Sequence, residues 1–518
     1  MKTVVGELGR RLRPHWWWLV LATTGLVGCA GLVIGWVRVL AAHDATLGPI
    51  YGFDDPLYYQ LMAAGRLCLH NATSLLADGG CRVRPVWWIG GLLSFGQPAL
   101  GGLLLRVITL AALALVLGWG ARQWARREGL PELPARNLLV AGLVLSPLPL
   151  ALLMPYAIGV SDLTLSESLV FSPPNLLSWL LYTVTVGGLY VYRDRPQAWP
   201  FLGLVAGFWG LNHPFFLGFM LSLFGLWLVI EWRQTRRHWL AAVALVVPPG
   251  LAGLYYIWLS RVNQFFQFHL ISNVTRHYPG MVWWLAAAIT MVVIMAWYGY
   301  YRTQVGRSRP LPDRFLLLWV AVAGLWQFVP QPTERRLVLI LALPLALLVA
   351  RMLLSTSQLW VRRAVAGLWV SNGLMLLAVA LSMNAPLFGR DVQRYMVTPR
   401  DQQFAQQLSP PGRLQRYLAD IPAANEFLWQ TPLLILNGHQ FESPRFDQLN
   451  RALADLRDGH SSCQAFAQRV APLQLDGLVL QRAASARLIA RLAACGSRPL
   501  HQNATWTVMT PPAARAGF

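Results

Sequence analysis

Two adjacent carboxylates stand in the stretch Gly52-Phe53-Asp54-Asp55-Pro56-Leu57-Tyr58-Tyr59, just after the first very hydrophobic segment of the chain. Carboxylates beside a lipid face are costly unless they reach water or perform a chemical task. A carboxylate in this place can take a proton from a hydroxyl group or bind a divalent cation. Asp55 also fits the N-cap of a helix, because Pro56 suits the first helical position. Asp54 is not needed as a cap, so it is the better candidate for chemistry.

Further acids, histidines and arginines occur in loops that we predict to lie on the same side of a membrane. They are Asp162, Glu167 and Ser168, then Asn212 and His213, then Arg276, His277 and Tyr278, and finally Glu334, Arg335 and Arg336. Transfer of a sugar from a lipid phosphate needs a base for the acceptor hydroxyl and positive charge for the departing phosphate. Arginines at the end of a span suit the phosphate, because a guanidinium pairs with two phosphate oxygens while the lipid tail stays in the bilayer. Alternatively, Mg²⁺ or Mn²⁺ held by carboxylates such as Asp54 and Glu167 does part of this work.

Each of these later residues also has a purely structural explanation. Arg335 and Arg336 are suited to anchor a span at the lipid headgroups. His277 fits a solvated loop histidine, His213 beside Pro214 fits a buried turn, and Glu167 fits a solvated loop carboxylate. The sequence leaves these alternatives open.

The composition excludes an ordinary soluble domain. Of the 518 residues, 55% are hydrophobic and only 13% are charged, and 24 are tryptophan, which indicates a polytopic membrane protein. The formal net charge is +21, but the basic residues are dispersed in short clusters between apolar runs. Nucleic-acid binding needs them gathered on one solvated face, so we expect no nucleic-acid partner.

Eleven apolar runs have about the length of a membrane span. They cover approximately residues 16–39, 99–121, 138–157, 174–192, 198–212, 214–231, 239–259, 280–300, 315–330, 336–354 and 361–383. The first run is too long for a cleavable signal and no small-residue cleavage site follows it. The fifth and sixth flank Asn212-His213-Pro214, where a short span or a re-entrant turn satisfies the pattern equally well. The predicted class is an α-helical polytopic membrane protein with about eleven transmembrane helices.

Basic residues alternate between the loops in the way that sets membrane orientation. With the amino terminus in the cytoplasm, the inner short loops carry 20 arginine and lysine residues and the outer short loops carry 8. The positive-inside rule therefore predicts a multi-pass protein of the inner or plasma membrane with a cytoplasmic amino terminus. An odd number of spans places the chain after residue 383 outside. The predicted domains are a transmembrane module, 1–383, and a soluble extracytoplasmic domain, 384–518.

Two segments outside the membrane have a predicted structure of their own. The first outer loop, 41–98, is too long for a simple connection, and we expect interface helices at 55–67 and around Val86-Trp87-Trp88-Ile89. In the tail, short apolar runs at 432–436 and 477–480 alternate with helical patterns at 445–456 and 483–494. This alternation predicts a small α/β domain.

The cysteines fit this topology. Cys68 and Cys81 share the first outer loop, and Cys463 and Cys495 share the tail. Two even pairs in segments outside the cytoplasm predict two disulfides in an oxidising compartment. Free thiols are the alternative for each pair.

The acidic stretch resembles the Asp-Glu-x-x-Tyr element of the GT-C superfamily of integral membrane glycosyltransferases. The resemblance places Asp54 on the family's first acid, which serves as a base or a metal-bound carboxylate, with Asp55 on the second acid and Tyr58 on the aromatic residue. Arg276-His277-Tyr278-Pro279 is similar to a His/Pro/aromatic element near the substrate, and Pro332-Thr333-Glu334-Arg335-Arg336 resembles a Glu-Arg-Arg/Phe element of some mannosyltransferases. The sequence departs from the family in carrying Asp55 for Glu and Asn212-His213-Pro214 for Thr-Lys-Pro. It has no Trp-Trp-Asp motif, which argues against transfer of oligosaccharide to protein.

The expected function is transfer of one sugar, with inversion, from a polyprenyl-phosphate donor to a lipid, glycan or protein acceptor on the extracytoplasmic face. Its partners are then membrane lipid, the donor and the acceptor. A polysaccharide polymerase or ligase is the main alternative, and it does not need an acid pair after the first span. A transporter should show ionisable residues near the middle of its spans and an internal repeat, and this sequence has few such residues and no repeat. An assembly scaffold would tolerate Asp54→Asn without losing its role.

Overall fold

The computed structural model describes part of the chain, and its contacts divide the chain into two units. The described residues are 34, 37, 46–47, 68–69, 82–83, 85–95, 98–145, 173–262, 314–326, 338–355, 359–388, 396–397, 399–408, 415–420, 434–436 and 446–513. The first unit comprises Met1–Gly31, Leu103–Ile257 and Val274–Pro386, and the second comprises Leu32–Gly102, Trp258–Asn273 and Leu387–Phe518. The predicted domain boundary after residue 383 stays a prediction.

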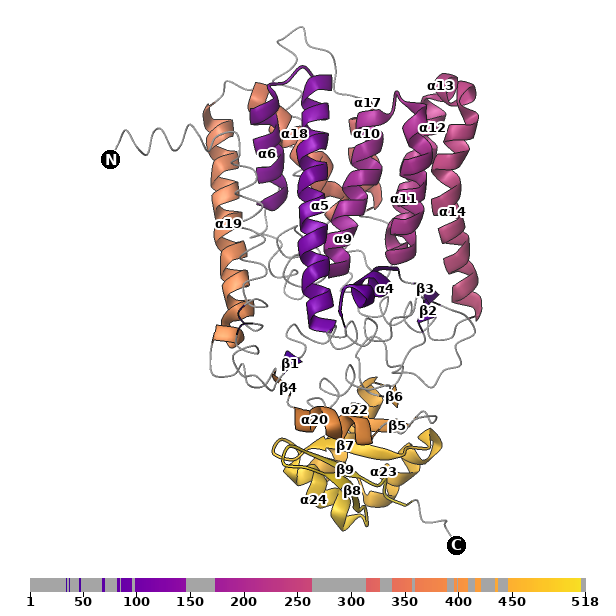
Figure 1. Cartoon of the computed structure of the whole chain (residues 1–518), viewed down its shortest axis with the longest axis vertical. Helices are drawn as coiled ribbons and strands as arrows, with labels where there is room; N and C mark the ends of the chain where they lie inside the picture. Colours follow the sequence, from indigo (N-terminus) through magenta and orange to yellow (C-terminus); the bar gives the residue numbers. More distant parts are fainter. Residues whose placement is uncertain are drawn as a thin grey trace, which may run out of the picture. The chain divides into compact units, whose positions relative to one another are not determined.

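The described part of the first unit is built of helices. They are α5 (Pro98–Arg127), α6 (Glu132–Val144), α9 (Pro173–Tyr182), the π-helix η2 (Thr183–Gly187), α10 (Gly188–Tyr192), η3 (Pro196–Ala198), α11 (Trp199–Asn212), η4 (Pro214–Phe216), α12 (Leu217–Ile230), α13 (Trp232–Arg237), α14 (Trp239–Val262), α17 (Arg314–Trp326), α18 (Val338–Ser355) and α19 (Leu359–Phe388), of which α5, α14 and α19 continue into the second unit. Helix α6 packs on α18, α18 on α17, α17 on α12, and α9 on α11 (Figure 1).

These helices coincide with the apolar runs of the sequence wherever the structure describes those runs. By length and composition, Leu100–Arg127 and Trp239–Val262 are long and apolar enough to cross a membrane, and Pro214–Ile230, Arg314–Trp326 and Leu339–Leu354 are shorter apolar helices. The predicted runs at 16–39 and 280–300 lie outside the described residues, apart from Ile34 and Val37. The helical class is therefore observed, and the number of spans stays a prediction.

The run predicted at 174–192 is a helix with a π turn in its middle. Within η2, the hydroxyl of Thr185 donates to the carbonyl oxygens of Leu181 at 2.7 Å and Tyr182 at 3.2 Å. The hydroxyl of Thr183 donates to the carbonyl of Trp179 at 2.8 Å. Side-chain donors of this kind satisfy carbonyls that a wider turn leaves without an i+4 partner. The irregularity is local, so the helix continues through α10.

Glycines on one face of α11 bring its backbone close to α14. A Cβ atom at Gly203 would lie 2.1 Å from the carbonyl oxygen of Ala244 and 2.7 Å from the Cα of Leu245. A Cβ at Gly207 would lie 2.9 Å from the Cβ of Pro248. Small residues at such positions allow the backbone contact on which helix association in lipid depends.

Gly203→Ala is expected to destabilise the protein by roughly 1–3 kcal/mol, because the new methyl group has to push a rigid backbone away. The thermal midpoint of the detergent-solubilised protein measures this change. Gly225→Ala on α12 is the matched control, since a Cβ there would meet nothing within 4 Å. That control is expected to stabilise the helix by about 0.5–1 kcal/mol, and equal midpoints for the two variants would contradict the packing role of Gly203.

The second unit contains a five-stranded sheet with the order β6-β5-β7-β9-β8. Its strands are β5 (Arg416–Ala419), β6 (Leu434–Ile435), β7 (Gly477–Gln481), β8 (Pro499–Gln502) and β9 (Trp506–Met509); β6, β5 and β7 are parallel, and β9 is antiparallel to β7 and β8. The helices of this part are α20 (Pro399–Gln407), α22 (Phe446–Asp458), α23 (Cys463–Val470), the 3₁₀ turn η7 (Ala471–Leu473) and α24 (Ala486–Ala494). The strand and helix segments predicted in the tail thus have these structures.

Alternating residues of the strands enter two separate cores. Tyr417 and Val479 pack with Phe404 of α20, whereas Leu418 and Leu478 pack in a larger cluster with α22, α23 and α24. This follows from the period of two along a strand, which sends neighbouring side chains to opposite faces. The sheet is therefore covered by helices on both faces.

The predicted Cys463–Cys495 disulfide is present and joins the start of α23 to the end of α24. For the other predicted pair, Cys68 lies in the short strand β2 (Cys68–Leu69), and Cys81 lies outside the described residues. Strand β2 pairs with β3 (Arg82–Val83), and β1 (Thr46–Leu47) pairs with β4 (Met396–Val397). The element predicted around Val86 is the helix α4 (Pro85–Leu92), in which Trp87 is buried and Trp88 is exposed.

Candidate functional site

His213 is the predicted site residue that the structure describes. The others lie outside the described residues: Asp54, Asp55, Tyr58, Glu167, Arg276, His277, Tyr278, Glu334, Arg335 and Arg336. Among the residues that are described, no group of three or more His, Cys, Asp or Glu side chains is placed to hold a metal ion. The metal ligands predicted at Asp54 and Glu167 stay predictions.

His213 occupies the break between α11 and η4. Its backbone has φ −137° and ψ 80°, because the ring of the following Pro214 disfavours the helical conformation for the residue before it. The His213 N–H donates to the carbonyl of Trp209 at 2.8 Å, and the His213 carbonyl accepts from Phe216 at 3.3 Å. The side chain is only 5% exposed. His213 is thus a buried histidine at a helix break.

The end of α11 is held by polar side chains. The hydroxyl of Tyr256 on α14 donates to the carbonyl of Leu211 at 2.6 Å. The amide of Asn212 donates to the carbonyl of Phe208 at 2.9 Å. These donors satisfy carbonyls that the last turn of a helix leaves open, so the break at His213 has a defined geometry.

Helix α9 runs antiparallel to α11 and adds two more buried polar residues. The indole N–H of Trp209 donates to the hydroxyl of Ser178 at 3.2 Å. Asn175 lies about one turn before Ser178 on α9, and His213 lies about one turn after Trp209 at the end of α11. Because the two helices are antiparallel, both residues lie toward the same end of the helix pair. Asn175 and Ser178 are 5% and 1% exposed. We call Asn175, Ser178, Asn212 and His213 the outer polar cluster, because the sequence predicts this end of the helices to lie outside.

Aromatic residues form a rigid layer beside this cluster. The ring of Tyr182 lies 5.5 Å from that of Trp209, 6.4 Å from Phe219 and 5.8 Å from Trp319. The indole of Trp319 donates to the Tyr182 hydroxyl at 2.9 Å, and that hydroxyl donates to the carbonyl of Ile340. The layer joins α9, α11, α12, α17 and α18, and thereby fixes the helices that carry the cluster.

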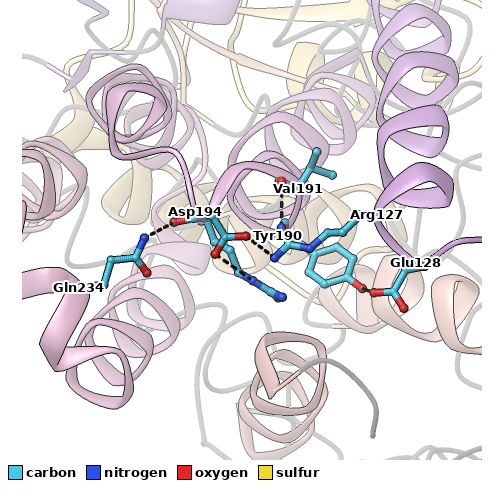
Figure 2. Close-up of polar contacts among 7 residues, drawn as sticks. Arg127, Glu128, Tyr190, Val191, Asp194 and Gln234 are labelled. Carbon is cyan, nitrogen blue, oxygen red and sulfur yellow. Dashed lines mark hydrogen bonds and ion pairs between the residues drawn. The ribbon is translucent and has the colours of Figure 1, made fainter. Parts of the chain in front are cut away.

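A polar network joins the end of α5 to α10, to the loop after α10 and to α13 (Figure 2). Arg127 donates to the carbonyls of Tyr190 at 3.2 Å and Val191 at 3.0 Å, and it pairs with Asp194 at 2.5 Å. The amide of Gln234 donates to the carbonyl of Arg193 at 3.3 Å. These contacts bring together loops that the sequence predicts to share the cytoplasmic side.

Glu128 and Arg351 form an ion pair within this network, and both side chains are 9% exposed. The hydroxyl of Tyr190 donates to Glu128 at 3.2 Å (Figure 2). This ion pair was not predicted from the sequence. A usable signal was present, because Glu128 is an acidic residue in a loop that is otherwise rich in arginine. We call Arg127, Glu128, Tyr190, Asp194 and Arg351 the inner polar network.

Comparisons with known proteins give structural matches. No family model matches the chain, and no curated protein matches it by sequence. The crystal structure of ArnT from Cupriavidus metallidurans has a TM-score of 0.50 and 13% identity, and the match covers 97% of this chain and 99% of that one. The arabinofuranosyltransferase AftD from Mycobacteria has a TM-score of 0.48 and 15% identity over 96% of this chain and 40% of that one. The Archaeoglobus fulgidus oligosaccharyltransferase has a TM-score of 0.49 and 11% identity over 92% of this chain and 71% of that one.

The ArnT match extends over nearly the whole of both chains, and its low identity makes it a likeness of fold. It agrees with the resemblance that the acidic stretch around Asp54 carries in the sequence. This chain therefore shares the fold of that ArnT structure.

Proposed function

We propose that the chain is a membrane glycosyltransferase of the GT-C type. It transfers a sugar from a polyprenyl-phosphate-linked donor to a lipid, glycan or protein acceptor on the extracytoplasmic face. The observation that carries this proposal is the fold shared with ArnT along 97% of the chain. The adjacent acids Asp54 and Asp55 after the first apolar run support it, because fold alone does not define an activity.

The reaction needs one base and one phosphate-binding site. The acceptor hydroxyl oxygen attacks the anomeric carbon of the donor sugar, the bond from that carbon to the phosphate oxygen breaks, and polyprenyl phosphate leaves. Asp54 takes the hydroxyl proton, and Asp55 caps the helix that follows and supports Asp54. Arg276, Arg335 and Arg336 bind the phosphate through charge-assisted hydrogen bonds. A single displacement of this kind inverts the anomeric centre.

A divalent cation is an optional part of this site. Asp54 and Glu167 have the oxygen donors that Mg²⁺ or Mn²⁺ prefers. Such an ion would supply positive charge for the leaving phosphate. Chelation followed by return of the metal to purified protein distinguishes the two cases, since a metal-free mechanism predicts no change in turnover.

His213 is proposed as a donor-binding residue. It is buried at a break between helices, next to Asn212 in the chain, and an imidazole N–H can donate to a phosphate oxygen. His213→Leu is expected to raise the KM for the donor more than tenfold, since a hydrogen bond to a charged group contributes about 1.5–3 kcal/mol.

His213→Gln is the matched variant, because glutamine keeps a side-chain N–H donor. We expect its KM for the donor to stay within about threefold of the wild type, a difference below 1 kcal/mol. Steady-state kinetics on protein in nanodiscs measure both values. If the two variants lose donor affinity equally, His213 has the structural role of a turn residue.

The experiment that tests the proposed function is lipid analysis of a deletion strain. We expect a polyprenyl-phosphate-linked sugar to accumulate and one glycosylated product to disappear, and complementation to restore both. Purified protein should then release polyprenyl phosphate from the accumulated lipid when the acceptor is added. An unchanged lipid and glycan profile in the deletion strain would show the proposal to be wrong.

A further inference from the structure

A large apolar cavity lies in the half of the first unit that carries the inner polar network. Its volume is about 660 Å³, and it is lined by residues of α5, α6, the η2–α10 segment, α11 and α18. Leu117, Trp124, Val184, Leu202 and Leu347 are among the side chains that line it. This volume lies within the range of about 300–1,000 Å³ typical of ligand sites.

Gly120 is one of the residues that line this cavity. A Cβ atom at Gly120 would meet nothing within 4 Å, so this position faces open space. The lining also reaches the surface, since Trp119 is 51% and Phe201 is 60% exposed. In a protein placed in a bilayer, a cavity with exposed apolar side chains at its edge is open to lipid chains.

The cavity has a basic and polar mouth. The guanidinium of Arg195 lies 5.5 Å from the ring of Tyr192, which stacks on Trp119 with ring centroids 5.2 Å apart. Arg195, Tyr192 and Gln197 line the cavity. The apolar cavity thus ends beside the positively charged side chain of Arg195, which is exposed.

A second, more open pocket adjoins this mouth. It has a volume of about 410 Å³ and shares Gln197 with the apolar cavity. Its lining includes Arg237, His238 and Trp239, which are all exposed. Exposed arginines and a tryptophan at the end of apolar helices are suited to the headgroup region of a membrane.

We propose that these two pockets bind an acidic glycerophospholipid of the cytoplasmic leaflet. One acyl chain fills the apolar cavity, and the phosphate lies at Gln197 between Arg195 and Arg237. The positive mouth complements the negative charge of that leaflet. A lipid fits this place better than the sugar donor does, because the acids proposed for transfer lie on the other side. The inference rests on the membrane orientation of the proposed function and not on its transfer step.

Native mass spectrometry of protein released from nanodiscs tests the proposal. The nanodiscs contain phosphatidylglycerol and phosphatidylethanolamine in equal amounts, and retained lipid is counted per protein. Gly120→Phe is expected to reduce retained phosphatidylglycerol at least fivefold, because the ring fills the cavity. Gly367→Phe on α19 is the matched control, since Gly367 is exposed and a Cβ there meets nothing within 4 Å. That control should retain lipid as the wild type does.

The headgroup contacts have their own variant. Arg195→Gln combined with Arg237→Gln is expected to lower the preference for phosphatidylglycerol over phosphatidylethanolamine about tenfold. Both lipids carry a phosphate, but the ammonium group of phosphatidylethanolamine cancels its charge, so the loss of two positive side chains weakens binding of the anionic lipid more. Both arginines are exposed, so these changes leave the helix packing intact.

Equal retention in the wild type, Gly120→Phe and Gly367→Phe would overturn the proposal. In a second set of nanodiscs that also contain polyprenyl phosphate, retention of polyprenyl phosphate in place of phosphatidylglycerol, lost in Gly120→Phe, would also overturn it, because the occupant would be a different lipid. Asp54→Asn should retain phosphatidylglycerol as the wild type does. Loss of sugar transfer and loss of this lipid are therefore separate results.

Discussion

Asp54→Asn is expected to abolish formation of the glycosylated product. Asparagine has nearly the size of aspartate, but its amide does not accept the proton of the acceptor hydroxyl. Removal of a general base lowers a rate by about 10²–10⁴-fold, so we expect at least a hundredfold loss of turnover. Purified protein in nanodiscs, with lipid donor extracted from the deletion strain, gives the rate, and the same variant should fail to complement that strain.

Asp55→Asn is the control for the neighbouring acid. Asparagine is as good an N-cap as aspartate, so this variant keeps the predicted start of the helix at Pro56 and should retain most of the activity. Both variants are compared at equal amounts of protein in the membrane. Full activity of Asp54→Asn would make Asp54 a structural residue, and the polymerase or ligase and scaffold alternatives would then be preferred.

Arg351→Met is expected to cause the largest loss of stability among the substitutions considered. It leaves Glu128 without its ion-pair partner where both side chains are 9% exposed. Removing one partner of a buried ion pair costs about 3–5 kcal/mol, because a charge stays uncompensated away from water. The thermal midpoint in detergent should fall clearly below that of the wild type.

The double variant Glu128→Gln with Arg351→Met separates charge from packing. If the uncompensated carboxylate causes the loss, the double variant should recover a large part of the stability lost in Arg351→Met. Tyr190 still has a hydrogen-bond acceptor in the glutamine side chain. A double variant as unstable as Arg351→Met would instead mean that the methionine disturbs the packing of α18.

Much of the secondary structure followed from the sequence, because hydropathy and turn residues are local properties. The apolar run at 239–259 lies within α14, and the predicted strand at 477–480 lies within β7. The break at Pro214 is likewise a local effect of proline on the residue before it. The Cys463–Cys495 pairing followed from two cysteines sharing one predicted compartment.

The sequence by itself thus determined the apolar helices that the structure describes, two of the five strands of the tail and the acidic motif from which the function is proposed. Only the tertiary structure decided which side chains meet. Glu128 and Arg351 are 223 residues apart, and Trp319 reaches Tyr182 across 137 residues. The apolar cavity at Gly120 also depends on five helical segments from distant parts of the chain. Such contacts arise where helices pack against one another. Packing depends on the complementary shapes of segments that are distant in the sequence, and a local sequence pattern does not contain this information.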